Sequence, residues 1–453
     1  MCLTKKHKLQ KGLMNQMEYS ANELKIQEFS EDWDKQILPL LPKDIDQRLK
    51  DSGCIKRFRG ICNAMALIKS ILFFAISKIS LAQLAAITQA VGLASMSDTA
   101  WRKCLLKIIP FLDTIIQNLL NAIITIPFGK ESPKVFLVDA TSVRLQGKEQ
   151  YLERIHVSFD LNNNRIAQLK ITDKHTAESF SHFSMNPGEI FIGDAGYSYV
   201  RNFVYAIEQG ADVIIRINPQ NFPLYDIMGN RLKYENLMPN SKEQSKSTLC
   251  LLKYNGKYYK ARIVIGRLPQ NKIKAAQKRK SSVSSKKQKH IRPETTRNAG
   301  FVFLVTSLTG EEYGQDAILE LYRARWQVEL LFKCFKQKLD IRTIRIASPT
   351  YARVMIYLWL IIFIITERNL IKTQITFEEL QEMHEINLWN VFTISFIRVK
   401  QILELKIPFN ELPRGVWVRM ASHRRKKRQY QNKFIREALL PNLKCSGLKE
   451  VFE

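Results

Sequence analysis

Three carboxylates in the sequence have types and positions suited to metal-dependent chemistry. Asp139 ends the apolar run "VFLVD", Asp194 ends the apolar run "IFIGD", and Glu329 lies within the stretch "YRARWQVELLFKCFKQK". Carboxylate oxygens suit Mg²⁺ or Mn²⁺, and two such ions about 4 Å apart can activate a nucleophile and stabilise a leaving 3′ oxygen on DNA. The residues therefore predict a site for two divalent ions, although each aspartate alone is more simply explained as the start of a turn.

Cations and a tyrosine accompany the glutamate at helical spacing. Residues 322–338 are predicted to form one helix with an apolar face. At 100° per residue, three polar residues fall within about 60° of Tyr322 on one side: Arg325, Glu329 and Lys336. We predict that Arg325 and Lys336, assisted by Tyr322, hold the phosphates on either side of the scissile one. Taken alone, this helix is more simply explained by an i,i+4 surface pair between Arg325 and Glu329.

The two aspartates require a sheet that brings their strands together. Three runs rich in Val, Ile and Phe follow residue 134, and the turn sequence "DLNNNRI" joins the last two, which predicts a hairpin. Strand, helix and strand then alternate to residue 217, which favours a mixed sheet with helices packed on it. A carboxylate at the carboxyl end of a buried strand stands where such sheets present catalytic groups.

The predicted fold class is therefore α/β, with additions at both ends and one insertion. The N-terminal region is predicted to bind DNA, because its segments 80–92 and 97–108 have the outline of a helix-turn-helix. The insertion contains an Asn-Gly turn between two strands and then a basic arm. The predicted regions are a helical domain at 1–130, a mixed-sheet core at 131–217 and 300–345, a β-rich insertion at 218–299, and a helical region with a basic tail at 346–453.

The composition points to a nucleic-acid partner. Among 453 residues, 70 Lys and Arg stand against 42 Asp and Glu, giving a net charge of +28 and a pI near 9.8. Such an excess favours nucleic acid first and an anionic membrane second. The seven cysteines are scattered without a CxxC pair, which argues against a zinc ribbon or a disulfide framework and suits a reducing cytosol. The longest apolar run, Val354–Ile365, falls short of the roughly 20 residues of a membrane span, so we predict a buried helix and a cytoplasmic protein with no membrane partner.

These residues together resemble a DDE transposase of the bacterial insertion-sequence four family. That family's signature is Tyr, two residues, Arg, three residues, Glu, six residues, Lys, and it is complete here as Tyr322, Arg325, Glu329 and Lys336. "VFLVDATSV" and "FIGDAGYSY" resemble the segments of the family's two aspartates. "VIIRIN" resembles the strand after the second aspartate, which implies that Arg216 lies near the DNA. The resemblance covers roughly residues 95–370.

The resemblance implies a ribonuclease H-like core and cut-and-paste transposition. Asp139, Asp194 and Glu329 would hold two Mg²⁺ or Mn²⁺ ions. Water would free a 3′-OH at the transposon end, a DNA hairpin would form and reopen, and the 3′-OH would attack target DNA. Because each step is an in-line displacement at phosphorus, one site can serve them all. The implied partners are double-stranded DNA at the transposon ends and target, bound by a homodimer at the nucleoid.

Two other functions fit the same residues. One is a metal-dependent nuclease of the same fold that does not rejoin ends, and the other is an inactive DNA-binding derivative of a transposase. Asp173 and Glu178 follow a strand and could approach the site, but we rank them below the three chosen carboxylates. Trp326 could stack on a base, although a tryptophan on an amphipathic helix is more often part of the core.

Overall fold

The computed structural model describes most of the chain between residues 29 and 405. The gaps are 56–57, 78, 122–132, 146–150, 164, 271, 276–277, 279–292, 309, 311–312, 339–342, 345–347 and 376–387. The described residues form two compact units, one drawn from Met1–Lys43 and Leu112–Gln401 and the other from Asp44–Phe111 and Ile402–Glu453. Most of the predicted basic arm and all of the predicted basic tail lie outside the described residues.

A mixed sheet organises the larger unit. Its hydrogen-bonded order is β3-β2-β1-β4-β5-β8-β7-β6, and β9 pairs with β1 off this path. Strand β2 is antiparallel to its two neighbours β1 and β3, whereas β4 and β5 run parallel to β1. This confirms the predicted α/β class with a mixed sheet. The strands are β1 Val135–Leu145, β2 Tyr151–Asp160, β3 Arg165–Asp173, β4 Ile190–Gly193, β5 Asp212–Arg216, β6 Ser245–Tyr254, β7 Lys257–Arg267, β8 Phe301–Thr306 and β9 Thr343–Ile344.

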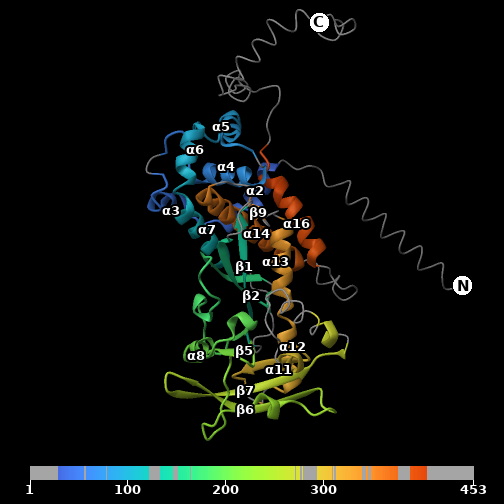
Figure 1. Cartoon of the computed structure of the whole chain (residues 1–453). Helices are drawn as coiled ribbons and strands as arrows, with labels where there is room; N and C mark the ends of the chain where they lie inside the picture. Colours follow the sequence, from blue (N-terminus) through green and yellow to red (C-terminus); the bar gives the residue numbers. More distant parts are fainter. Residues whose placement is uncertain are drawn as a thin grey trace, which may run out of the picture. The chain divides into compact units, whose positions relative to one another are not determined.

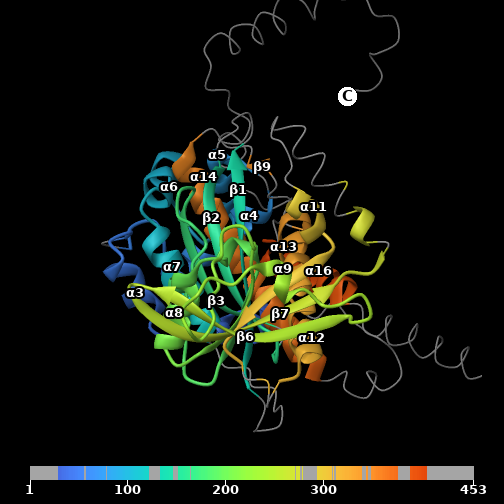
Figure 2. The ribbon, with the colours of Figure 1, turned by 60° about the horizontal axis from the view of Figure 1, so that its bottom comes forward.

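The β-rich insertion continues this sheet at one edge. Strands β6 and β7 form a hairpin around Asn255 and Gly256, whose φ angles of 47° and 78° are those of the predicted Asn-Gly turn. Strand β7 also pairs with β8, and β8 pairs with β5 of the core. Figure 2 shows β6 and β7 crossing below the core strands. The insertion is therefore an extension of the core sheet.

Helices cover the sheet of the larger unit. Helix α8 packs on β5 and β6, α12 on β6 and β7, and α14 on β2 and β3, while α13 runs alongside β1 (Figure 1). The helices are α2 Phe29–Gln36, α7 Ile109–Asn121, which begins in the smaller unit, α8 Val200–Glu208, α9 Tyr234–Leu237, α11 Pro293–Asn298, α12 Gln315–Arg323, α13 Trp326–Lys338, α14 Pro349–Ile375 and α16 Leu388–Leu403, with short 3-10 turns η1 Leu38–Leu40, η2 Phe180–His182 and η3 Ala195–Tyr197.

Helix α14 contains the long apolar run noted in the sequence. By length and composition its segment Pro349–Asn369 could span a membrane, but 67% of its most apolar window is buried inside the protein. The run Val354–Ile365 lies against β2 and β3, as predicted for a buried helix.

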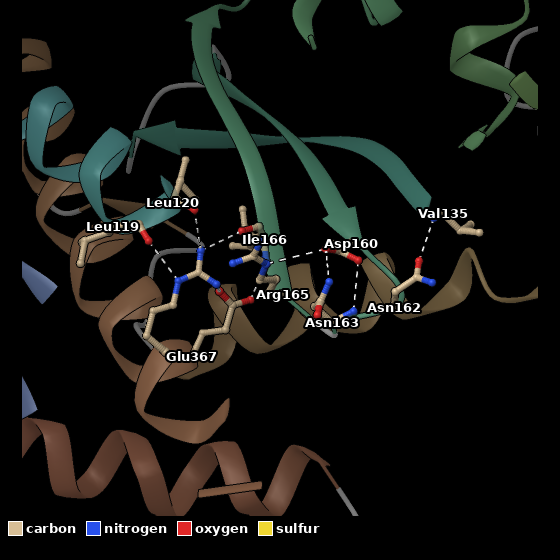
Figure 3. Close-up of polar contacts among 10 residues, drawn as sticks. Leu119, Leu120, Val135, Asp160, Asn162, Asn163, Arg165, Ile166 and Glu367 are labelled. Carbon is tan, nitrogen blue, oxygen red and sulfur yellow. Dashed lines mark hydrogen bonds and ion pairs between the residues drawn. The ribbon is translucent and has the colours of Figure 1, made fainter. Parts of the chain in front are cut away.

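A buried ion pair near the end of α14 connects three elements. Arg368, which is fully buried, donates to the backbone oxygens of Leu119 (3.0 Å), Leu120 (3.3 Å) and Ile166 (3.1 Å) (Figure 3). Its neighbour Glu367 accepts from the Ile166 N–H at 2.8 Å and lies 3.6 Å from the Arg368 guanidinium. Burial raises the pKa of Glu367 to about 7, although Arg368 opposes the rise. The pair thus ties the end of α7 and the start of β3 to α14.

The same region holds the start of β1. Asp160 at the end of β2 accepts from the N–H of Asn163 and lies 3.7 Å from Arg165. In the same turn, the side-chain oxygen of Asn162 accepts from the Val135 N–H at 2.8 Å (Figure 3). These contacts fix the β2–β3 turn against the first residue of β1, four positions before Asp139.

The smaller unit contains the predicted pair of helices. Its helices are α3 Ile45–Asp51, α4 Ala64–Ser77, α5 Leu81–Ala90 and α6 Asp98–Leu105. Ser80 and Gln83 form a reciprocal capping box at α5, and the Ser97 side chain caps α6. On α6, Trp101 is buried while Arg102 and Lys103 are exposed. The helix pair predicted from the sequence is therefore present, and its contact with DNA stays a prediction.

Candidate active site

Sheet register places the two aspartates side by side. The parallel pairing of β1 with β4 ends at Val138 opposite Gly193, so Asp139 and Asp194 are the next residues on adjacent strands. Asp194 follows its strand, as predicted. Asp139 does not end its strand, and that part of the prediction is wrong. β1 continues to Leu145 because β2 pairs with it beyond this point and β9 joins it at Arg144 and Leu145.

The next strand adds Arg216 to the same row. Gly193 of β4 pairs with Ile215 of β5, so Arg216 follows Ile215 as Asp194 follows Gly193. Arg216 is exposed. Two carboxylates and a guanidinium therefore leave three adjacent parallel strands at one level of the sheet.

A fourth charged residue, Glu178, reaches Asp194 from the segment between β3 and β4. The Asp194 Oδ1 atom accepts from the Gly196 N–H at 2.7 Å. A Cβ atom added to Gly196 would lie 1.6 Å from Oε2 of Glu178 and 3.0 Å from Oδ1 of Asp194. The Glu178 carboxylate thus fills the space above Gly196, beside Asp194. Of the two carboxylates ranked below Asp139, Asp194 and Glu329, Glu178 therefore approaches Asp194, whereas Asp173 is exposed and accepts from the N–H groups of His175 and Thr176.

Negative charge at this place is incompletely compensated. Burial, and then the charges of Asp194 and Glu178, raise the pKa of Asp139 to about 7, against the opposing effects of the Ala140 N–H and Arg325. Burial and Asp194 likewise raise the pKa of Glu178. The fully buried Tyr197 has a pKa raised by burial and by these three carboxylates. A bound cation would relieve this repulsion, but in the described part of the chain no three His, Cys, Asp or Glu side chains converge closely enough to hold one.

The predicted single helix over residues 322–338 is wrong. Helix α12 ends at Arg323 and α13 begins at Trp326. In the turn between them, the backbone N–H of Arg325 donates to the backbone carbonyl of Tyr322. The backbone N–H of Val328 likewise donates to the backbone carbonyl of Arg325, so both bonds have the i to i−3 pattern. The break turns the Arg325 side chain inward to 13% exposure, while Glu329 in the first turn of α13 stays 57% exposed.

Arg325 connects the first aspartate with the glutamate. Its Nη1 atom lies 3.5 Å from Oδ2 of Asp139, and its Nη2 atom is hydrogen-bonded to Oε1 of Glu329. Its guanidinium also lies over the Tyr322 ring, 5.8 Å from the centroid. Although burial opposes it, contact with Tyr322, Glu329 and Asp139 raises the pKa of Arg325, so the arginine is charged at any pH the protein meets.

The remaining signature residues lie on the same helices. The buried Tyr322 hydroxyl makes no hydrogen bond of regular geometry among the described residues, but it lies near the guanidinium groups of Arg216 and Arg325. Burial raises the pKa of Tyr322, and these two arginines oppose the rise. Lys336 is half-buried on α13, seven residues or about 10 Å beyond Glu329 along the helix. Trp326 is 54% exposed, so the expectation of a core tryptophan is wrong.

Comparison with known proteins places the chain in a family. The sequence model of the family described as "Transposase DDE domain" matches residues 130–365, about half of the chain. The chain belongs to this family. The matched range contains Asp139, Asp194 and the whole of residues 322–336.

Relatives of this transposase include other insertion-sequence transposases. It is 25% identical over 324 residues to the transposase for insertion sequence element IS421 of Escherichia coli, covering 70% of this chain and 87% of the relative. It is also 25% identical over 215 residues to the transposase for IS231C of Bacillus thuringiensis subsp. berliner, covering 42% and 44%. A solved piggyBac transposase synaptic complex with hairpin DNA has a TM-score of 0.39 and 10% identity over 89% of this chain and 83% of that one.

Family membership gives this transposase its general activity. It is a DNA-binding transposase of an insertion sequence, and the DDE family depends on divalent metal ions, usually Mg²⁺. The individual roles of the site residues stay predictions.

Proposed function

We propose that this transposase moves its insertion sequence by cut-and-paste DNA cleavage and strand transfer at the site around Asp139. The observation that carries the proposal is the register that sets Asp139 beside Asp194, together with the Arg325 bridge from Asp139 to Glu329. These contacts join residues from two strands and a distant helix, with all three carboxylates belonging to one constellation.

The donor set fits two Mg²⁺ or Mn²⁺ ions. Asp139, Asp194 and Glu329 would supply only oxygen atoms, which these ions prefer, and the repulsion that raises the pKa of Asp139 would be relieved by cations. When bound, the ions would supply an activated nucleophile and stabilise the leaving 3′ oxygen. Because Arg325 pairs with both Asp139 and Glu329 in this structure, it would have to give up these partners as the carboxylates take metal.

The freed guanidinium has an obvious acceptor in the DNA. Arg325 would bind a phosphate beside the scissile bond through two parallel N–H groups, a geometry that suits phosphate oxygens. Arg216, Tyr322 and Lys336 would contact the backbone on either side. Trp326, exposed next to Arg325, would be able to stack on an unpaired base. Hydrolysis, hairpin formation and strand transfer could all use this one phosphate position, with no covalent protein intermediate.

Arg325 provides the first test of these roles. Arg325→Ala should lower the rate of end cleavage about 100-fold, the typical loss when one preorganised electrostatic group is removed. Arg325→Lys should recover little, because an ammonium cannot form the same fork. The measurement is single-turnover cleavage of DNA carrying a transposon end.

A matched control lies two residues upstream. Arg323 is 68% exposed and pairs with Glu320, so Arg323→Ala removes the same charge from the neighbouring turn and should leave cleavage unchanged. If Arg325→Ala lowers the melting temperature but leaves the cleavage rate unchanged, Arg325 and Glu329 form only a structural ion pair.

DNA binding by the N-terminal helices provides the second test. Each phosphate contact contributes about −0.9 to the slope of log affinity against log salt. Replacing Arg102 and Lys103 with alanine should therefore flatten the slope by about 2. The matched double variant Arg48→Ala/Lys50→Ala, on α3, should leave the slope unchanged. Equal slopes in all three proteins would show that α6 does not contact DNA.

Cut-and-paste chemistry also predicts a homodimer that holds two ends. Both ends must be brought together before either is released, and the net charge of +28 exceeds what one active site needs. Light scattering of the protein with end DNA should therefore give two chains and two ends. A complex of one chain and one end that cleaves fully would contradict the dimer. Joining of the cleaved 3′ end to target DNA would separate this function from that of a nuclease that only cuts.

A further inference from the structure

The Glu178 carboxylate is held at the site by contacts on both sides of it in sequence. Before it, the Asp173 side chain closes a turn by accepting from the Thr176 N–H, and the Arg154 guanidinium donates to the backbone carbonyl of Thr176 at 3.0 Å. After it, the buried Asn202 side chain accepts from the Phe180 N–H at 3.2 Å. The segment between these anchors has little freedom, so the position of Glu178 is set by the fold.

Gly196 makes room for this carboxylate. A Cβ atom at position 196 would lie 1.6 Å from Oε2 of Glu178, far inside van der Waals contact. The φ angle of Gly196 is outside the left-handed range, so the backbone itself does not demand glycine there. The glycine two residues after Asp194 is instead explained by the close approach of Glu178.

The location of Glu178 is unfavourable without a cation. Its carboxylate is half-buried beside Asp194, and no hydrogen bond or ion pair to it is found among the described residues. The charge of Arg154 lowers the pKa of Glu178 against the larger effects of burial and Asp194, but the two side chains form no ion pair. A partly desolvated carboxylate next to another one costs free energy unless a positive charge compensates it.

A second group at the same place also lacks a partner. The Tyr197 side chain is fully buried and stacks on Phe180, with ring centroids 5.1 Å apart. Its hydroxyl has no hydrogen-bond partner among the described residues. Burial, and then the charges of Glu178, Asp139 and Asp194, raise the pKa of Tyr197. Buried hydroxyls are normally paired, so this one points to something absent from the protein alone, such as a ligand of a bound cation.

We propose that Glu178 is a fourth metal-site carboxylate, which would close with Asp139 and Asp194 around a divalent ion before DNA binds, because the three described side chains do not yet converge closely enough to hold one. This inference rests on the proposed metal site and deepens it. In this structure Arg325 engages Asp139 and Glu329, and Glu329 is 57% exposed, whereas Glu178 already lies beside Asp194. Glu178 would therefore secure the first ion, and Glu329 would join once DNA draws Arg325 away.

The test is Mn²⁺ binding to the full-length protein without DNA. Binding is monitored through the electron paramagnetic resonance signal of the Mn²⁺ that stays free in solution. Glu178→Gln, which keeps the shape and removes the charge, should weaken binding about 10- to 100-fold, as loss of a supporting carboxylate does in other metal sites. Glu178→Asp keeps the charge but withdraws it by one methylene, so it should also weaken binding. Glu208→Gln, on α8, is the matched control and should bind as the wild type does.

Two further variants separate this inference from the proposed function. Asp139→Asn and Asp194→Asn should each weaken Mn²⁺ binding. If they do and both Glu178 variants bind with wild-type affinity, Glu178 is not part of the site and the inference fails alone. If neither aspartate variant changes Mn²⁺ binding, the metal site itself is misplaced and both fail. Thermal melts of each variant establish that the protein measured is folded.

Discussion

Asp139→Asn is expected to abolish DNA cleavage and to raise the stability of the protein at neutral pH. Loss of a metal-binding carboxylate removes several kcal/mol of transition-state stabilisation. Since each 1.36 kcal/mol is a factor of ten in rate, cleavage should fall at least about 1000-fold. End binding should change little, because the phosphate contacts come from Arg and Lys side chains elsewhere.

The gain in stability follows from the raised pKa of Asp139. Its folded-state pKa of about 7 exceeds the ordinary value of 3.8, so the folded protein binds this proton more tightly than the unfolded chain. The wild type therefore loses stability as the pH rises from about 4 through 7. The asparagine variant lacks that loss, and its melting temperature should exceed that of the wild type at pH 8 but not at pH 4.

Mg²⁺ supplies the control for this interpretation. The ion should raise the melting temperature of the wild type at pH 8 and have little effect on Asp139→Asn, because ligands that bind the folded state stabilise it by mass action. A variant that melts lower than the wild type at pH 8, or that still cleaves DNA at a comparable rate, would show that Asp139 has a structural role only.

The parts of the fold set by local sequence were predictable. Apolar runs that end in Asp gave the strands before Asp139 and Asp194, and Asn255 and Gly256 marked the hairpin of the insertion. The continuation of β1 beyond Asp139 is not predicted, because an aspartate that follows an apolar run is most simply explained as the start of a turn. Pairing with β2 and β9, which are distant in sequence, keeps those residues in the strand.

The parts set by tertiary contacts could not be predicted. Nothing in "YRARWQVE" breaks a helix, since it contains neither Gly nor Pro and has several good helix formers. The helix is nevertheless interrupted at Arg325, where the arginine side chain turns inward and contacts Asp139 and Glu329. Glu178 lies in a segment without hydrophobic periodicity, so the sequence does not predict where its side chain lies. The one sequence feature consistent with its position is Gly196, which leaves room for another group beside Asp194.

Arg368→Leu is expected to have the largest effect on stability. The substitution removes a fully buried guanidinium, leaving Glu367 as an uncompensated buried carboxylate and the oxygens of Leu119, Leu120 and Ile166 without this donor. Breaking a buried pair from one side typically costs about 3–5 kcal/mol. The measurement is the free energy of unfolding from denaturant titration, with Arg398→Leu as the control.

Arg398 is a suitable comparison because it is 57% exposed and lies 3.5 Å from Asp32, so its loss should cost no more than about 1 kcal/mol. Replacing Glu367 with glutamine in the Arg368→Leu background should recover part of the lost free energy of unfolding, because it removes the buried, unpaired carboxylate. Recovery should be greater at pH 8 than at pH 5, because the pKa of Glu367 is about 7 in the wild type and rises further without Arg368, so the buried group is already neutral at pH 5. If Arg368→Leu unfolds no more easily than Arg398→Leu, the buried pair does not hold α7, β3 and α14 together.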